Sequence, residues 1–143
     1  MTTTELRIGN LMLTYNSKKN PFEHPKIILP IIGIDDFGNI RFRDNSTSIG
    51  GYSIKIDFVE GVPITKERLA EFGIDGVKFC NSFIVMAIIP FTTTTATKEE
   101  FSGRWRVLLL GLVPYEVNRR FKYIHQIQNL YYELTGEELK LKS

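Results

Sequence analysis

Cysteine is almost absent from this chain, and so is any strong excess of charge. The chain has one cysteine, Cys80, so no internal disulfide can form and a reducing compartment suits the protein. We interpret Cys80 as a small buried apolar residue, since no nucleophile motif surrounds it. The net charge is only +2 over 143 residues. No polyanionic partner is therefore required, and any anion binding has to be local.

Long apolar segments are also missing. The longest apolar runs, residues 83–89 and 107–113, are far shorter than the ~18 to 20 residues of a membrane-spanning helix. Residues 1–5 lack the basic and apolar regions of a signal peptide. We therefore expect no contact with a membrane and a location in the cytoplasm.

No catalytic or metal-binding motif is visible. His24 and His125 have no Cys, His or acidic neighbours at ligand spacing, and the acidic pairs 35–36 and 137–138 fit a solvated turn and a solvated tail. A glycine-rich phosphate loop is missing as well. We expect a non-enzymatic protein without metal or cofactor. A nuclease or hydrolase whose residues converge from distant segments stays an alternative.

What the chain does contain is an ordinary globular composition. It is 43% hydrophobic and 24% charged, which predicts a folded protein, and its length predicts a single domain over residues 1–143. The patterns below indicate an α+β fold. We expect an antiparallel sheet or small barrel of about six to seven strands, one short central helix and one long C-terminal amphipathic helix.

Apolar and β-branched residues, often alternating with polar ones, predict the strands. In residues 52–58 the alternation points Tyr52, Ile54, Ile56 and Phe58 to one inner face. The predicted strands cover residues 6–15, 27–34, 40–43, 52–58, 77–81, 82–89 and 104–113.

Turn residues divide these strands. Residues 35–39 have the composition of a hairpin turn. Pro30 should place its strand at a sheet edge, because proline donates no backbone hydrogen bond. Pro90 should end the apolar strand before it, and a polar connector, residues 92–100, should follow.

Two helices are predicted. Thr65 can cap a short helix that Gly73 ends. In residues 115–134, apolar residues recur every three or four positions, which indicates a long amphipathic helix that Gly136 terminates.

Two segments resemble a known group of proteins. Residues 5–11 (ELRIGNL) and 123–139 (YIHQIQNLYYELTGEEL) resemble the start and the end of small uncharacterised proteins carried by phages and mobile elements of Bacteroidota, and residues 63–73 are similar to their middle segment. The resemblance implies a phage-type accessory protein acting in the host cytoplasm. It implies no site residues, because that group has no established activity.

The candidate site lies in the last third of the chain, where basic and aromatic residues alternate. Arg104 and Arg106 should point to one side of a strand and Trp105 to the other. Helical spacing should place Asn118, Lys122, His125, Asn129 and Tyr132 on one polar stripe. The candidate ligand-binding residues are Arg104, Trp105, Arg106, Arg119, Arg120, Lys122, His125, Asn129 and Tyr132.

These residues suggest that the protein binds a small anionic nucleotide and sequesters it from a host defence, as a homo-oligomer that buries the ligand between subunits. One alternative is a nucleic-acid-binding module, because the leading short strands could form a small SH3-like or OB-like barrel. Another is a virion component or an inhibitor of a host protein.

Overall fold

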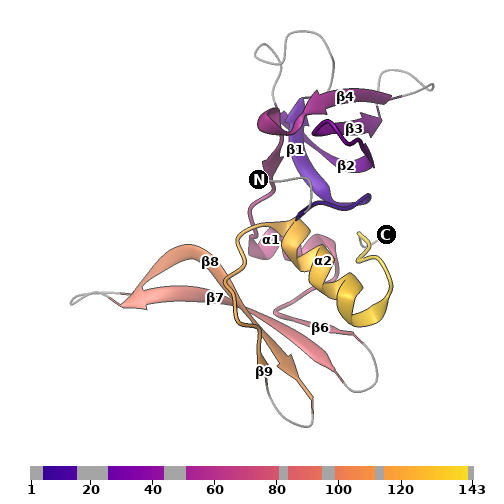
Figure 1. The fold of residues 1–143 in the computed structure, drawn as a ribbon. Helices are drawn as coiled ribbons and strands as arrows, with labels where there is room; N and C mark the ends of the chain where they lie inside the picture. Colours follow the sequence, from indigo (N-terminus) through magenta and orange to yellow (C-terminus); the bar gives the residue numbers. More distant parts are fainter. Residues whose placement is uncertain are drawn as a thin grey trace. The chain divides into compact units, whose positions relative to one another are not determined.

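The computed structural model describes residues 5–15, 26–43, 51–80, 84–94, 99–111 and 115–141. The chain divides into two compact units, Met1–Val62 and Pro63–Ser143. The described residues form two antiparallel sheets, of five and four strands, with one short helix and one helix of 12 residues (Figure 1). The α+β class and the two helices are confirmed, with nine strands in the described chain. The expectation of a single domain stays a prediction.

The first unit is a five-stranded antiparallel sheet with the strand order β4-β3-β2-β1-β5. A 3-10 turn, Ile56–Phe58, joins β4 to β5. The strands are β1 Leu11–Tyr15, β2 Lys26–Ile34, β3 Asn39–Arg43, β4 Gly51–Lys55 and β5 Glu60–Gly61.

The predicted hairpin between β2 and β3 is confirmed. The Asp35 carboxylate accepts hydrogen bonds from the backbone N–H groups of Phe37 (2.8 Å) and Asn39 (2.9 Å), and from the Asn39 side-chain amide (2.9 Å). Gly38 adopts a φ of 83°, which costs glycine little. The turn is therefore specified by residues close to one another in sequence.

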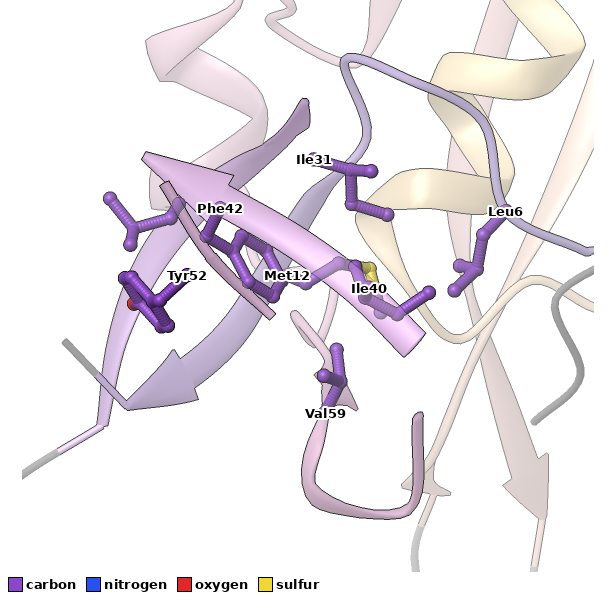
Figure 2. Close-up of a cluster of buried hydrophobic side chains, with 8 residues drawn as sticks. Leu6, Met12, Ile31, Ile40, Phe42, Tyr52 and Val59 are labelled. Carbon is purple, nitrogen blue, oxygen red and sulfur yellow. The ribbon is translucent and has the colours of Figure 1, made fainter. Parts of the chain in front are cut away.

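The core of the first unit lies on one face of its strands. Figure 2 shows buried hydrophobic side chains from β1, β2, β3 and β4 that point toward one another. In β3 the buried Ile40 and Phe42 alternate with the exposed Arg41 and Arg43, so the period-two pattern gives the correct face. The buried cluster consists of Leu6, Met12, Leu29, Ile31, Ile40, Phe42, Tyr52 and Val59.

Two predicted strands are shorter than expected. The first begins at Leu11, because the Asn10 side chain accepts a hydrogen bond from the Arg7 backbone N–H (2.7 Å) and forms a turn. The strand predicted over residues 52–58 ends at Lys55. The 3-10 turn that follows leaves Phe58 39% exposed rather than inward.

The second unit is a four-stranded antiparallel sheet with the order β6-β7-β8-β9. In Figure 1, β7 and β8 run side by side and extend well beyond the two short strands. The strands are β6 Val77–Phe79, β7 Val85–Thr94, β8 Glu99–Leu110 and β9 Tyr115–Glu116. The helices are α1 Lys66–Glu71 and α2 Ile124–Thr135.

The short helix follows the prediction closely. The Thr65 hydroxyl accepts a hydrogen bond from the Arg68 backbone N–H (3.0 Å) and caps α1. Gly73 has a φ of 74°, the left-handed conformation in which helices often end.

The two central strands are longer than predicted. β7 continues through Pro90 to Thr94, and β8 starts at Glu99, so most of the expected polar connector is strand. Gly103, with a φ of 83°, lies inside β8 where the register shifts, so it forms a bulge rather than the start of the strand.

Both strand prolines lie where a backbone N–H is not needed. The Ile31 N–H donates a hydrogen bond to the Asn10 carbonyl, on the β1 side of β2. The nitrogen of the preceding residue, Pro30, therefore faces the β3 side, where backbone pairing starts only at Ile31. The expectation of an edge strand for Pro30 is wrong, because β2 lies between β1 and β3. The Ile88 N–H donates a hydrogen bond to the Gly76 carbonyl, on the β6 side of β7. Two residues further on, the Pro90 nitrogen faces the same side, beyond the point where pairing with β6 stops, so no N–H is needed there.

The long C-terminal helix starts later than predicted. Of residues 115–134, Tyr115–Glu116 form β9, and α2 begins only at Ile124. Phe121 instead exchanges backbone hydrogen bonds with Trp105 of β8, and the Gln126 side chain accepts the backbone N–H groups of Lys122 (2.7 Å) and Tyr123 (2.9 Å). The helix ends at Gly136 as predicted, with a φ of 74°.

Candidate anion-binding surface

The two faces of the second sheet differ in exposure. Trp105 is 4% exposed, and Met86, Ile88 and Val107 on the same face are also buried. Lys78 shares this face with Met86 and lies 5.9 Å from the Tyr131 ring, which places α2 there. Alternation along β8 puts Arg104 and Arg106 on the other face. The prediction that the two arginines point away from Trp105 is confirmed.

Three arginines gather at one end of that outer face with a carboxylate and an aromatic ring, and we call these five residues the arginine cluster. It consists of Arg104 and Arg106 on β8, Arg120 after β9, the Glu116 carboxylate on β9 and the Phe91 ring on β7. Arg104 lies across from Phe91 in the β7–β8 pairing. The five residues carry a formal charge of +2, from three arginines and one glutamate.

Glu116 joins two of these arginines. Arg106 Nε lies 2.7 Å from Oε1 of Glu116 and Arg106 Nη2 lies 3.4 Å from Oε2, while Arg120 Nη1 lies 3.3 Å from Oε1. The hydrogen bond from Arg106 holds the pKa of Glu116 below its usual value, and the same pair raises the pKa of Arg106. Two guanidinium groups therefore converge on one carboxylate position.

An aromatic ring and an apolar surface adjoin the charges. The Arg120 guanidinium carbon lies 4.5 Å from the centroid of the Phe91 ring, a cation–π contact. Along the same face, Ile89 is 37%, Leu110 38% and Val77 43% exposed. The arginines thus border a partly exposed apolar sheet face.

Trp105 contributes to the packing of the second unit rather than to the arginine cluster. Its indole N–H donates a hydrogen bond to the backbone carbonyl of Ile64 (3.2 Å), and its ring meets Phe101 edge-on at 5.5 Å. The sheet separates this ring from the arginine cluster.

The remaining candidate residues lie elsewhere in the unit. The Arg119 guanidinium carbon lies 4.8 Å from the Phe121 ring centroid, and Lys122 Nζ lies 5.4 Å from the Tyr123 ring centroid. Both residues precede α2, so each covers a neighbouring ring rather than continuing a helical stripe.

The predicted polar stripe is wrong. Asn118 and Lys122 lie outside α2, and His125 is 2% exposed with its ring stacked on Tyr123 at 5.6 Å. Asn129 is half-buried, and Tyr132 is 40% exposed. The stripe fails because the helix starts nine residues later than assumed, at Ile124 instead of Tyr115. Of the nine candidate residues, the structure brings together Arg104, Arg106 and Arg120.

Two hollows lie among the described residues of the second unit, one apolar and one polar. An apolar groove of ≈ 600 Å³ lies between α1 and the part of β7 around Ile88 and Pro90, with Trp105 in its lining. A polar hollow of ≈ 580 Å³ is lined by Lys78, Tyr131 and the segment that follows α2. Neither of these two hollows is lined by an arginine of the cluster.

Metal and thiol chemistry find little support in the part of the chain that the structure describes. No three His, Cys, Asp or Glu side chains there are grouped so that they could hold a metal ion. Cys80 is half-buried, and burial raises the pKa of its thiol, which disfavours the reactive thiolate. Among the described helices, none has the length and apolar character needed to cross a membrane.

Sequence reasoning assigned neither Glu116 nor Phe91 to the site. Phe91 belongs to the site through the β7–β8 pairing. Its position two residues after Ile89, on the same face of a strand, was the available signal. No protein-family model, curated protein or solved structure matches this chain.

Proposed function

We propose that this protein binds a phosphate-bearing nucleotide at the arginine cluster and releases it unchanged. The observation that supports this most is the convergence of Arg106 and Arg120 on a single carboxylate position. Guanidinium groups bind phosphate oxygens with the same paired geometry with which they bind a carboxylate. Arg104, on the same face and two residues from Arg106, adds a third guanidinium group.

The surroundings favour a nucleotide over free phosphate. Phe91 offers a ring on which a base can stack, and the bordering Ile89 offers apolar surface. A ligand with an anionic end and a flat apolar end matches both features.

Binding without chemistry is the simpler proposal for this cluster. A hydrolytic reaction needs a general base near the phosphate, and the carboxylate present is Glu116. Its lowered pKa and its hydrogen bonds to two arginines make it a weak proton acceptor. The cluster is therefore better suited to holding an anion than to activating water.

In the phage setting that the resemblance implies, such binding would lower the free concentration of a nucleotide signal used by a host defence. Arg104 and Arg120 are exposed, and a second copy of the chain would enclose a ligand bound to them. We therefore include a homo-oligomer in the proposal.

Isothermal titration tests the proposal with cyclic di- and trinucleotides, cyclic ADP-ribose isomers and nucleoside phosphates. At least one of these compounds is expected to bind. Arg106→Gln or Arg120→Gln is expected to lower the affinity for it about tenfold or more. Lys66→Gln, which removes an exposed cation of the second unit outside the cluster, is the matched control and should leave the affinity unchanged. Absence of binding by every member of the panel would overturn the proposal.

A further inference from the structure

The first unit has a basic surface of its own, formed by β3 and β4. Arg41 and Arg43 alternate with the buried Ile40 and Phe42, so both point to the outer face of the sheet. Lys55 lies on β4 directly across from Asn39, two residues before Arg41 on the same face. All three basic side chains are exposed. We call Arg41, Arg43 and Lys55 the cation row.

Two members of the row, Arg41 and Arg43, lie on an inner strand of the sheet. β3 lies between β2 and β4 and pairs with both. Gly33 of β2 is opposite Arg41, and a Cβ at Gly33 would lie 3.4 Å from the Arg41 Cβ, so the stem of Arg41 lies close over the glycine. Arg41 and Arg43 are two positions apart on the strand, a spacing of about 6.7 Å along it.

The row is not neutralised by its own strands. Within the described chain, none of the three cations makes a side-chain hydrogen bond or an ion pair. The other side chains on this face of the two strands are the neutral Asn39 and Ser53. The acidic residue nearest in sequence is Asp44, which directly follows Arg43 and lies outside the described residues. The nearest acidic groups that the structure describes are Asp35 and Asp36 in the preceding turn and Asp57 in the following 3-10 turn.

An exposed aromatic ring stands at one end of the row. Phe37, at the tip of the β2–β3 hairpin, is 90% exposed. The Gly38 carbonyl accepts a hydrogen bond from the Ile56 N–H (2.9 Å), which holds this tip beside the Lys55 end of the row. The Asp35 carboxylate, in turn, fixes the backbone of Phe37 (2.8 Å). The ring is therefore presented by a structured turn.

We propose that this surface binds single-stranded nucleic acid, with backbone phosphates along Arg43, Arg41 and Lys55 and a base stacked on Phe37. Cations that follow the backbone and an aromatic ring that stacks a base are the two elements of single-strand recognition. The surface fits a linear polyanion better than a compact one, because its cations lie in a row instead of around one point. This inference is independent of the nucleotide site, which lies in the other unit.

Fluorescence anisotropy with a labelled oligothymidine of about 20 nucleotides tests it at several salt concentrations. Three phosphate contacts on a single strand predict that log K falls with log salt with a slope of about −2. The double variant Arg41→Gln/Arg43→Gln should reduce the slope to about −0.7, because one contact is left. Phe37→Ala should weaken binding about tenfold and leave the slope unchanged, because stacking releases no counterions.

Lys66→Gln is the matched control, since it removes an exposed cation of the other unit outside the arginine cluster and should leave oligothymidine binding unchanged. Absence of binding at about 50 mM salt would overturn the inference. Equal binding by the cation-row variants and the unmodified protein would overturn it as well. Loss of binding in Arg106→Gln alone would place the nucleic acid on the arginine cluster and would also overturn it.

Discussion

The indole N–H of Trp105 donates a hydrogen bond to the backbone carbonyl of Ile64, 3.2 Å away, and so joins strand β8 to the segment that leads into helix α1. Both residues are buried, at 4% and 3% exposure. Trp105→Phe would leave the Ile64 carbonyl without this donor, and we expect a loss of about 1 to 3 kcal/mol in the free energy of unfolding.

Urea denaturation followed by circular dichroism measures this loss. Tyr115→Phe is the control, because Tyr115 is 59% exposed and its change should have little effect. Nucleotide affinity should be the same in Trp105→Phe as in the unmodified protein, since the indole lies on the opposite face from the arginine cluster. A stable Trp105→Phe protein with weakened nucleotide binding would show that Trp105 contacts the ligand after all.

Glu116 occupies the position that we assign to the ligand's anionic group, so the two should compete. Glu116→Gln removes the charge while it keeps the size of the side chain, and we expect it to raise the affinity for a nucleoside monophosphate about threefold to tenfold. Glu71→Gln is the matched control, because Glu71 also pairs with an arginine, Arg68, at 3.5 Å. Weaker binding by Glu116→Gln would mean that Glu116 positions the arginines instead.

The β2–β3 hairpin should respond to acid through Asp35. Hydrogen bonds donated by the Asn39 backbone, then by its side chain, lower the pKa of Asp35 below its ordinary 3.8. A carboxyl whose pKa is lower in the folded than in the unfolded protein stabilises the fold above the unfolded value, and this contribution is lost as the pH falls through the folded value.

Asp35→Ala should therefore lower the melting temperature at pH 7, and the difference from the unmodified protein should shrink below pH 3.8. Asp36→Ala removes the neighbouring carboxylate without those hydrogen bonds and is the matched control. Thermal melts across this pH range provide the measurement. A difference for Asp35→Ala that stays constant with pH would contradict the assignment.

Pro90 protects an open strand edge. Its nitrogen faces the side on which β6 has already ended, so Pro90→Thr would add a backbone N–H donor to an unpaired part of β7. Exposed strand edges with free donors promote pairing between chains. We expect Pro90→Thr to self-associate more strongly than the unmodified protein in size-exclusion chromatography with light scattering. Identical profiles over a wide range of concentrations would contradict this role.

Features determined by neighbouring residues could be predicted from the sequence. The Thr65 cap, the stop at Gly73 and the turn at Asp35–Asn39 each depend on hydrogen bonds or backbone angles within a few residues. The alternation of basic and apolar residues in β3 likewise gave the correct outer face for Arg41 and Arg43.

Features determined by distant partners could not be predicted. Residues 117–123 have helical spacing, yet Phe121 pairs with Trp105, a contact between segments that no local pattern reveals. The same holds for the arginine cluster, where the β7–β8 register brings Phe91 opposite Arg104. The helical stripe failed for this reason, because its geometry assumed a helix where tertiary pairing keeps the chain extended.

Two-dimensional ¹H–¹⁵N NMR, titrated with the nucleotide that binds best, tests the central claim most directly. The account predicts that the Nε–Hε signals of Arg106 and Arg120 shift in a saturable manner, while the indole N–H signal of Trp105, the single tryptophan of the chain, stays in place. Shifts at Trp105 without shifts at either arginine would contradict it.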